Sequence, residues 1–346
     1  MKKIIKTVAF LAIALSAICC AKAVKEGPND AEERYFNAWM EVNHPGLQPV
    51  GSGIYVIEEE PGNAGAEVKE DNYVYASYTV TDLKGNITTY TEKETAEQLG
   101  KYVPSDYYGP KVITTFESTI PAGLKEAIVG MKVGGRKKVI IPSWLMTYNS
   151  YDKPEEYLEN ESSGTSCIYD IKITDVALDI SKHEITQMAQ YFADNGDIFG
   201  RDFTSADSLK GHYGCYYRQL VAPLDTTSFP KDTTIYINYT GKLLNGQVFD
   251  TTVEKVAKDN NIYSASKTYE PTSIKWAEKY EDITMGSGNS SLISGFALTL
   301  WQMRSMEKGV GVFYSPMGYS YNGSGSSIPP YAPLVFEIEI VAEPEE

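Results

Sequence analysis

Histidine and cysteine are scarce in this chain of 346 residues. It contains three histidines and four cysteines, and none of them stands in the C-x-x-C or H-x-x-x-H spacing of a zinc site. No G-x-S-x-G segment is present, and no cysteine and histidine form a pattern typical of a catalytic nucleophile. We therefore expect no metal, no cofactor and no covalent catalysis.

Positive charge and long apolar runs are also in short supply. The 31 lysines and arginines are outnumbered by 46 acidic residues, which gives a formal charge of −15 and argues against a nucleic-acid partner. The one long apolar run, 8–18, is too short to span a bilayer, so we expect no integral membrane protein. The length predicts two domains, and 42% apolar residues suffice for ordinary cores.

The amino terminus has the pattern of an export signal. Met1-Lys2-Lys3 precedes the apolar run 8–18, as in a secretory signal peptide. Cys19 and Cys20 follow at once, where bacterial lipoproteins carry their acylated cysteine, and one of the two is the expected lipidation site. Ordinary cleavage after Ala23 is the alternative and would remove both. We expect an exported lipoprotein anchored to the membrane of a bacterial envelope, on its periplasmic or its surface face.

Two amphipathic helices are predicted, one near the start of the mature chain and one near its middle. The first covers 29–43 and the second 181–195, and each ends at turn residues. The expected apolar faces are Tyr35, Trp39 and Val42 in the first helix and Ile185, Met188, Ala189 and Phe192 in the second.

After each helix the same succession of strands recurs, which indicates a divergent internal repeat. Short aromatic strands at 53–57 and 214–217 lead to alternating strands at 72–80 and 233–240. A turn glycine follows, Gly85 in the first copy and Gly246 in the second, and later come a short helix and a closing strand. The expected segments are a signal peptide with lipoprotein cysteine 1–20, a helix and linker 21–50, a first domain 51–177, a helical connector 178–212 and a second domain 213–346.

Four segments of the second copy carry a family resemblance. Residues 239–252 read Y-T-G-K-L-L-N-G-Q-V-F-D-T-T, 292–296 read L-I-S-G-F, 315–321 read S-P-M-G-Y-S-Y, and 328–336 read I-P-P-Y-A-P-L-V-F. In order and spacing they resemble the motifs of FKBP-type peptidyl-prolyl cis-trans isomerases, over 214–341, with a weaker copy over 51–176. The resemblance implies an α+β fold of two FKBP-like domains, each an antiparallel curved sheet wrapped on a short helix, with connecting helices.

The resemblance also implies a proline pocket in the second domain. Asp250 is expected to orient polar groups, Tyr321 to donate its hydroxyl to a substrate carbonyl, and Ile328 to offer a backbone N–H and an apolar side chain. A simpler reading exists for each residue, since aromatic residues on strands usually pack in cores and Asp250 could cap a turn. The expected walls and floor are Tyr239, Phe249, Phe336, Leu292, Ile293 and Phe296, the last where the family usually has tryptophan.

Such a pocket needs no nucleophile. Resonance gives the X-Pro amide a rotation barrier of ~18–20 kcal/mol, and a dry pocket that favours the twisted amide lowers that barrier. The expected activity is isomerisation of X-Pro bonds in exported proteins, with proline-containing polypeptides and macrolides as ligands. The segment 253–282 is longer than its family counterpart and lies beside the pocket, either as a flap or as a solvated loop.

The first copy lacks this chemistry. Thr88 and Thr89 stand where the second copy has Phe249 and Asp250, and Pro121 replaces Ile293. We expect an inactive domain that binds unfolded chains or spaces the second domain from the membrane. Two alternatives to a foldase stay open for the whole protein: a lipid-tethered binding or chaperone module without turnover, and a surface lipoprotein that holds glycans on its tyrosines.

Overall fold

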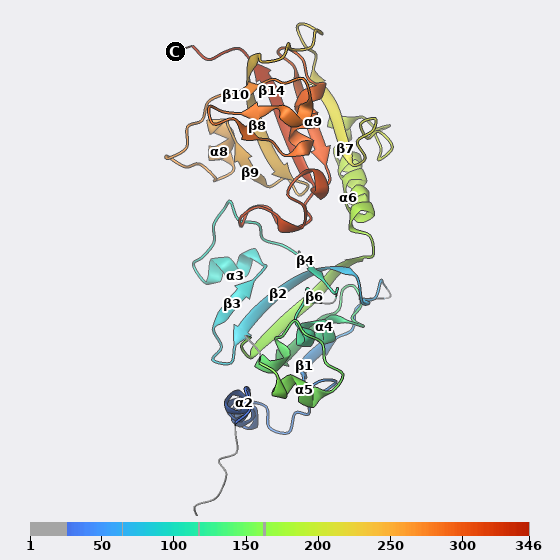
Figure 1. Cartoon of the computed structure of the whole chain (residues 1–346), viewed down its shortest axis with the longest axis vertical. Helices are drawn as coiled ribbons and strands as arrows, with labels where there is room; N and C mark the ends of the chain where they lie inside the picture. The colour runs from blue at the N-terminus through green and yellow to red at the C-terminus, as the bar shows by residue number, and fades with distance from the viewer. Residues whose placement is uncertain (1–25, 64, 117, 162–163, 346) are drawn as a thin grey trace, which may run out of the picture.

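The chain folds into two units, each built around one antiparallel sheet, which lie one above the other in Figure 1. This computed structural model describes residues 26–63, 65–116, 118–161 and 164–345. The signal peptide expected at 1–20, with Cys19 and Cys20, lies outside the described residues. Within them, no helix has both the length and the apolar character needed to cross a membrane.

The first sheet has the strand order β1-β5-β6-β2-β3, and β4 pairs with β2 beside β3. Alternating residues of β2 are buried, Val74, Ala76 and Val80 among them, as the period-2 pattern predicts. The elements of this unit are α2 (Asp30–Asn43), β1 (Tyr55–Glu60), β2 (Tyr73–Asp82), β3 (Ile87–Tyr90), α3 (Lys93–Gln98), β4 (Lys111–Thr114), α4 (Ala122–Ile128), β5 (Arg136–Ile141), η1 (Ser143–Leu145), α5 (Pro154–Glu159) and β6 (Cys167–Ala177).

The second sheet has the order β12-β11-β10-β8-β14-β13-β7, and β9 pairs with β8. Helix α9 lies across one face of it (Figure 1), and six of its nine residues are buried. The elements are β7 (Cys215–Val221), β8 (Thr234–Leu243), β9 (Val248–Thr251), α8 (Glu254–Asp259), β10 (Thr272–Lys275), η2 (Tyr280–Asp282), β11 (Thr284–Met285), β12 (Ser290–Ser291), α9 (Ser294–Gln302), β13 (Lys308–Phe313), η3 (Ser315–Met317), η4 (Ser320–Asn322) and β14 (Leu334–Val341).

The two sheets have the same connections, and β1, β2, β3, β5 and β6 correspond to β7, β8, β9, β13 and β14. The turns correspond as well, because Gly85 and Gly246 each have φ of 86°, a left-handed conformation that favours glycine. Tyr78 N–H donates to Thr91 Oγ1 and Tyr239 N–H donates to Thr252 Oγ1, both at 2.9 Å. The predicted α+β fold with two antiparallel, helix-backed sheets is therefore confirmed.

The connector between the sheets packs against the second one. Helices α6 (Ile180–Asp194) and α7 (Gly196–Phe199) bury Met188, Phe192 and Phe199 against Tyr216 of β7 and neighbouring valines. The second sheet is thus covered by α9 on one face and by the connector on the other. Because both faces of this sheet are buried, both carry apolar side chains.

The apolar face predicted for the first helix is wrong in part. Helix α2 buries Phe36 and Met40, whereas Tyr35 is 52% and Val42 80% exposed. The Phe36 ring meets Trp144 edge-on at 5.3 Å, so packing against the first core selects a stripe one residue away from the expected one. This helix belongs to the core of the first domain.

Candidate active site

A cavity of about 540 Å³ opens at the end of the second sheet where β8, β9 and β14 meet the start of α9. Eight of the nine pocket residues predicted from the sequence line it, and the exception is Tyr321. They come from three strands, one helix and two loops. The eight are Tyr239 on β8, Phe249 and Asp250 on β9, Leu292 and Ile293 before α9, Phe296 on α9, Ile328 in the last loop and Phe336 on β14.

The base of the cavity is a cluster of aromatic rings centred on Phe336. Its ring lies 4.9 Å from that of Phe296 and 5.6 Å from that of Phe249, both edge-on, in the geometry that aromatic pairs prefer. Tyr239 meets Phe296 edge-on at 5.6 Å. Phe296 and Phe336 are only 3% and 5% exposed, so the base of the cavity is apolar and packed into the core.

Gly241 makes room for this cluster. A Cβ atom at Gly241 would lie 2.6 Å from the Phe249 ring and 2.9 Å from the Phe336 ring, which is closer than carbon atoms approach. The glycine is needed for space, because its φ is not in the left-handed range. The register aligns Gly241 with Phe336 and with Asp250.

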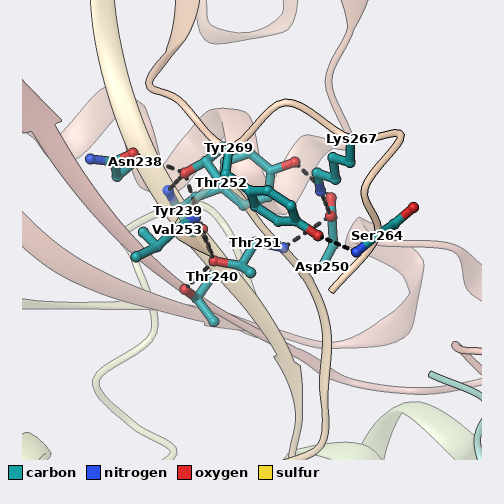
Figure 2. A network of polar contacts seen from close by, with 10 residues as sticks. All are labelled: Asn238, Tyr239, Thr240, Asp250, Thr251, Thr252, Val253, Ser264, Lys267 and Tyr269. Carbon is teal, nitrogen blue, oxygen red and sulfur yellow. Dashed lines mark hydrogen bonds and ion pairs between the residues drawn. The ribbon is translucent and has the colours of Figure 1, made fainter. Parts of the chain in front are cut away.

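The polar side of the cavity is built on Asp250 (Figure 2). Tyr239 Oη donates to Asp250 Oδ2 at 2.6 Å, and Thr251 N–H donates to Oδ1 at 2.9 Å. Burial, and then the charge of Asp250, raise the pKa of Tyr239 well above its usual value of 10. Tyr239 therefore stays protonated and is held in place as a pocket wall.

The long segment 253–282 supplies a third partner, which the sequence did not reveal. Lys267 Nζ forms an ion pair with Asp250 Oδ1 (Figure 2). The loop around this lysine is ordered by Tyr269, whose hydroxyl accepts a hydrogen bond from Ser264 N–H at 2.9 Å and whose ring stacks on Tyr263 at 5.3 Å. The segment also contains α8 and β10, but none of its own residues lines the cavity, so it reaches the cavity through the ion pair of Lys267.

Tyr321 lies outside the cavity, contrary to its predicted role. Its side chain is 64% exposed, and Tyr319 lines the cavity instead. The turn η4 changes the direction of the chain, because Ser320 has a φ of 51° and Gly323 one of 62°. Burial and the charge of Asp250 raise the pKa of Tyr319 above 10, and its hydroxyl has no acceptor among the described residues. Tyr319 is thus a protonated donor.

Ile328 has the predicted apolar role but not the predicted polar one. Its side chain lines the cavity and the residue is 4% exposed. Its N–H, however, already donates to the carbonyl of Ser324 at 3.1 Å. The backbone of Ile328 is thus used to close a small turn and is not free for a substrate.

The corresponding positions of the first domain differ. The shared register places Thr88 and Thr89 at the positions of Phe249 and Asp250, and Val80 at that of Gly241. Val80 is buried, with 6% exposure, and its side chain stands where the second domain has the hydrogen atom of Gly241. Over the described residues, no cluster of three or more histidine, cysteine or acidic side chains could hold a metal ion.

The chain is similar to several known proteins. Residues 226–341 match the FKBP-type peptidyl-prolyl cis-trans isomerase family. A probable FKBP-type peptidyl-prolyl cis-trans isomerase of Haemophilus influenzae is 26% identical over 162 residues, 46% of this chain and 56% of that protein. An FK506-binding protein of Neisseria meningitidis serogroup B is 30% identical over 111 residues, 32% of this chain and 80% of that protein.

A solved peptidyl-prolyl cis-trans isomerase from Pseudomonas syringae pv. tomato is also similar, with 25% identity and a TM-score of 0.29, over 47% of this chain and 92% of that one. The chain spans only about half of the length of the Haemophilus relative, whereas it spans most of the Neisseria relative. The chain belongs to the family of FKBP-type peptidyl-prolyl cis-trans isomerases.

Proposed function

We propose that the carboxy-terminal domain isomerises X-Pro bonds in other polypeptides. The observation that carries this proposal is the cavity of about 540 Å³ whose base is the Phe249, Phe296 and Phe336 cluster. A prolyl ring fits such an apolar floor, and the amide that precedes it then lies at the mouth, beside Tyr319 and Tyr239. Cavities of this size and apolar character are typical of ligand sites.

The mechanism follows from shape and dryness. The planar amide is stabilised in water by hydration of its charge-separated resonance form, and an aromatic cavity removes that hydration. A hydrogen bond from the Tyr319 hydroxyl to a substrate carbonyl next to the rotating amide can orient the peptide for the twisted state. A differential stabilisation of ~4 kcal/mol would accelerate rotation about a thousandfold. Asp250 contributes indirectly, by holding Tyr239 at 2.6 Å.

An isomerisation assay on X-Pro peptides tests the proposal. The full chain is expected to accelerate isomerisation and to be inhibited by FK506. Phe249→Ala should lower kcat/KM by at least ~10-fold, because the amide regains access to water, while Tyr148→Ala, at an exposed tyrosine of the first domain, should not. Failure of the full chain to exceed the uncatalysed rate would falsify the activity. Binding of FK506 without turnover would indicate a binding or chaperone module. Binding of glycans alone would indicate a glycan-binding surface lipoprotein.

The two loop tyrosines provide a second, sharper prediction. Tyr319→Phe removes one hydroxyl donor from the cavity and should lower kcat/KM about 3- to 10-fold, since a single hydrogen bond contributes ~0.5–1.5 kcal/mol. Tyr321→Phe should change it less than about 2-fold, because this side chain is 64% exposed. The two variants remove the same atom two residues apart. The reverse ranking in the peptide assay would restore Tyr321 as the donor.

We further propose that the protein acts outside the cytoplasm on exported proteins, tethered through a lipid on Cys19 or Cys20. This rests on the apolar run 8–18 followed by the two cysteines. Labelled fatty acid should be incorporated into the protein, and the double substitution of Cys19 and Cys20 by alanine should abolish it. Absence of label from the unsubstituted protein would select ordinary cleavage after Ala23.

A further inference from the structure

One wall of the cavity is a small hairpin of residues 324–328. Ser324 N–H donates to the Ile328 carbonyl at 2.8 Å, and Ile328 N–H donates to the Ser324 carbonyl at 3.1 Å. Ser324 and Ile328 both line the cavity. A two-stranded turn of this size is not stable by itself in water, so the position of this wall depends on what holds its tip.

The tip of the hairpin contacts the other domain. Ser326 Oγ donates to Asp106 Oδ1 at 2.5 Å, and Tyr107 N–H donates to the Ser326 carbonyl at 2.8 Å. Asp106 and Tyr107 lie in the segment between α3 and β4, which in Figure 1 rises from the first domain to the last loop of the second. The first domain therefore hydrogen-bonds to both the backbone and the side chain of Ser326.

Asp106 and Tyr107 are themselves held in place by other contacts. Gln247 of the second domain donates from Nε2 to the Asp106 carbonyl at 2.9 Å. The Tyr107 ring packs against the core of the second domain, and its hydroxyl donates to the Pro110 carbonyl at 3.1 Å. Burial raises the pKa of Tyr107 above its usual value. Asp106 and Tyr107 thus have fixed positions, and their hydrogen bonds fix the position of Ser326.

A second contact holds the chain just after the hairpin. The Tyr331 ring meets the Tyr73 ring of β2 edge-on at 5.3 Å. Tyr331 has a φ of 59°, a conformation that costs a non-glycine residue ~1 kcal/mol or more and persists only where its surroundings impose it. Its N–H donates to the Ser320 carbonyl at 2.9 Å. The loop is therefore bound to the first domain at two points.

We propose that the amino-terminal domain is a positioning domain, which holds the 324–328 hairpin against the substrate through Asp106 and Tyr107. Its Tyr73 holds the chain that follows the hairpin, through the contact with Tyr331. The inference rests on the proposed function of the carboxy-terminal cavity. It gives a role to a domain whose own pocket positions are Thr88, Thr89 and Val80. A wall that moves lowers the fraction of molecules competent to bind, and the apparent affinity falls by that fraction.

The test measures hydrogen exchange of the Ser324 and Ile328 amides together with peptide kinetics. Asp106→Ala should speed exchange of both amides about 2- to 10-fold and raise KM by a similar factor with little change in kcat. Asp106→Asn keeps the acceptor for Ser326 and should restore both. Ser326→Ala should match Asp106→Ala, and the double variant should be no worse than either, because all three remove one contact.

Gln190→Ala is the matched control. Gln190 lines a cavity of about 490 Å³ between the domains, but its side-chain hydrogen bond runs to Asp194 on the same helix, so exchange at Ser324 and Ile328 should not change. Unaltered exchange of both amides in Asp106→Ala would overturn the proposal, whatever happens to activity. Faster exchange in a protein without isomerase activity would uphold the positioning and overturn only the proposed activity.

Discussion

Valine in place of Gly241 is expected to close the proline cavity and to abolish FK506 binding. The added Cβ would lie 2.6 Å from the Phe249 ring and 2.9 Å from the Phe336 ring. Phe336 cannot retreat because it is surrounded by Phe296, Phe249, Tyr239 and Phe313, so Phe249 has to move into the cavity. Overpacking of this kind costs ~1–3 kcal/mol of stability, and the ligand site is lost with it.

Binding of FK506 by calorimetry measures the effect, with a loss of affinity of more than about 100-fold expected. Gly288→Val is the matched control, because Gly288 is exposed and a Cβ there would meet only Ser290 Oγ, at 3.9 Å. The first domain has valine at this position, Val80, together with Thr88 at the position of Phe249. A folded Gly241→Val protein that binds FK506 as tightly as the unsubstituted chain would contradict the role of the aromatic cluster.

Much of the fold follows from the sequence because local patterns determine it. The strands alternate with period 2, and the repeat fixes their order twice over. The face of helix α2 did not follow, because this helix has two adjacent apolar stripes, and only its contact with Trp144 selects Phe36 and Met40. Burial of a helix is decided by its tertiary partner, not by its own periodicity.

The cavity residues were predicted from the family resemblance, and only one of those outside the strands and α9 was misplaced. Leu292, Ile293 and Ile328 lie in loops and line the cavity as predicted. Tyr321 was expected in the cavity, but backbone angles at Ser320 put Tyr319 there instead. A serine in the sequence does not indicate that its backbone will adopt a left-handed conformation.

Long-range polar contacts left no local signal at all. Lys267 reaches Asp250 across 17 residues and Ser326 reaches Asp106 across 220. The lysine and the serine look like ordinary solvated side chains in the sequence, and only the folded chain shows that each is paired. A resemblance to a family carries the residues that the family shares, so contacts made by a longer loop or by a second domain fall outside it.

Glutamine in place of Glu184 is expected to stabilise the protein above neutral pH. Glu184 lies on α6 and is completely buried. Its carboxylate accepts hydrogen bonds from Ser315 N–H at 2.6 Å and Ser315 Oγ at 2.7 Å, just where the last loop starts toward the cavity. Burial raises the pKa of Glu184 from 4.5 to about 7, and the two hydrogen bonds from Ser315 offset only part of that rise.

The sign follows from where the proton is bound. Between pH 4.5 and 7 the folded chain keeps a proton on Glu184 that the unfolded chain has released, so the contribution of Glu184 to stability is greatest below pH 4.5 and is lost as the pH rises through 7. The two pKa values differ by about 2.5, and at ~1.4 kcal/mol per pKa unit the full cost above pH 7 is about 3 kcal/mol.

Glutamine has the shape of the protonated acid and keeps an acceptor for Ser315 N–H and a donor for Ser315 Oγ. Denaturant unfolding should therefore show Glu184→Gln and the unsubstituted protein within about 1 kcal/mol of each other at pH 5, and the variant more stable by up to about 3 kcal/mol at pH 8. Glu339→Gln is the matched control, because this side chain is at an exposed position of β14 and its substitution should change stability by less than about 0.5 kcal/mol. Glutamine keeps the hydrogen bonds to Ser315, the first residue of η3, so the following loop should stay in place. The Ser324 and Ile328 amides of Glu184→Gln should therefore stay protected from exchange at pH 8. Equal stability of the two proteins at both pH values would mean that Glu184 is ionised in the folded chain without cost.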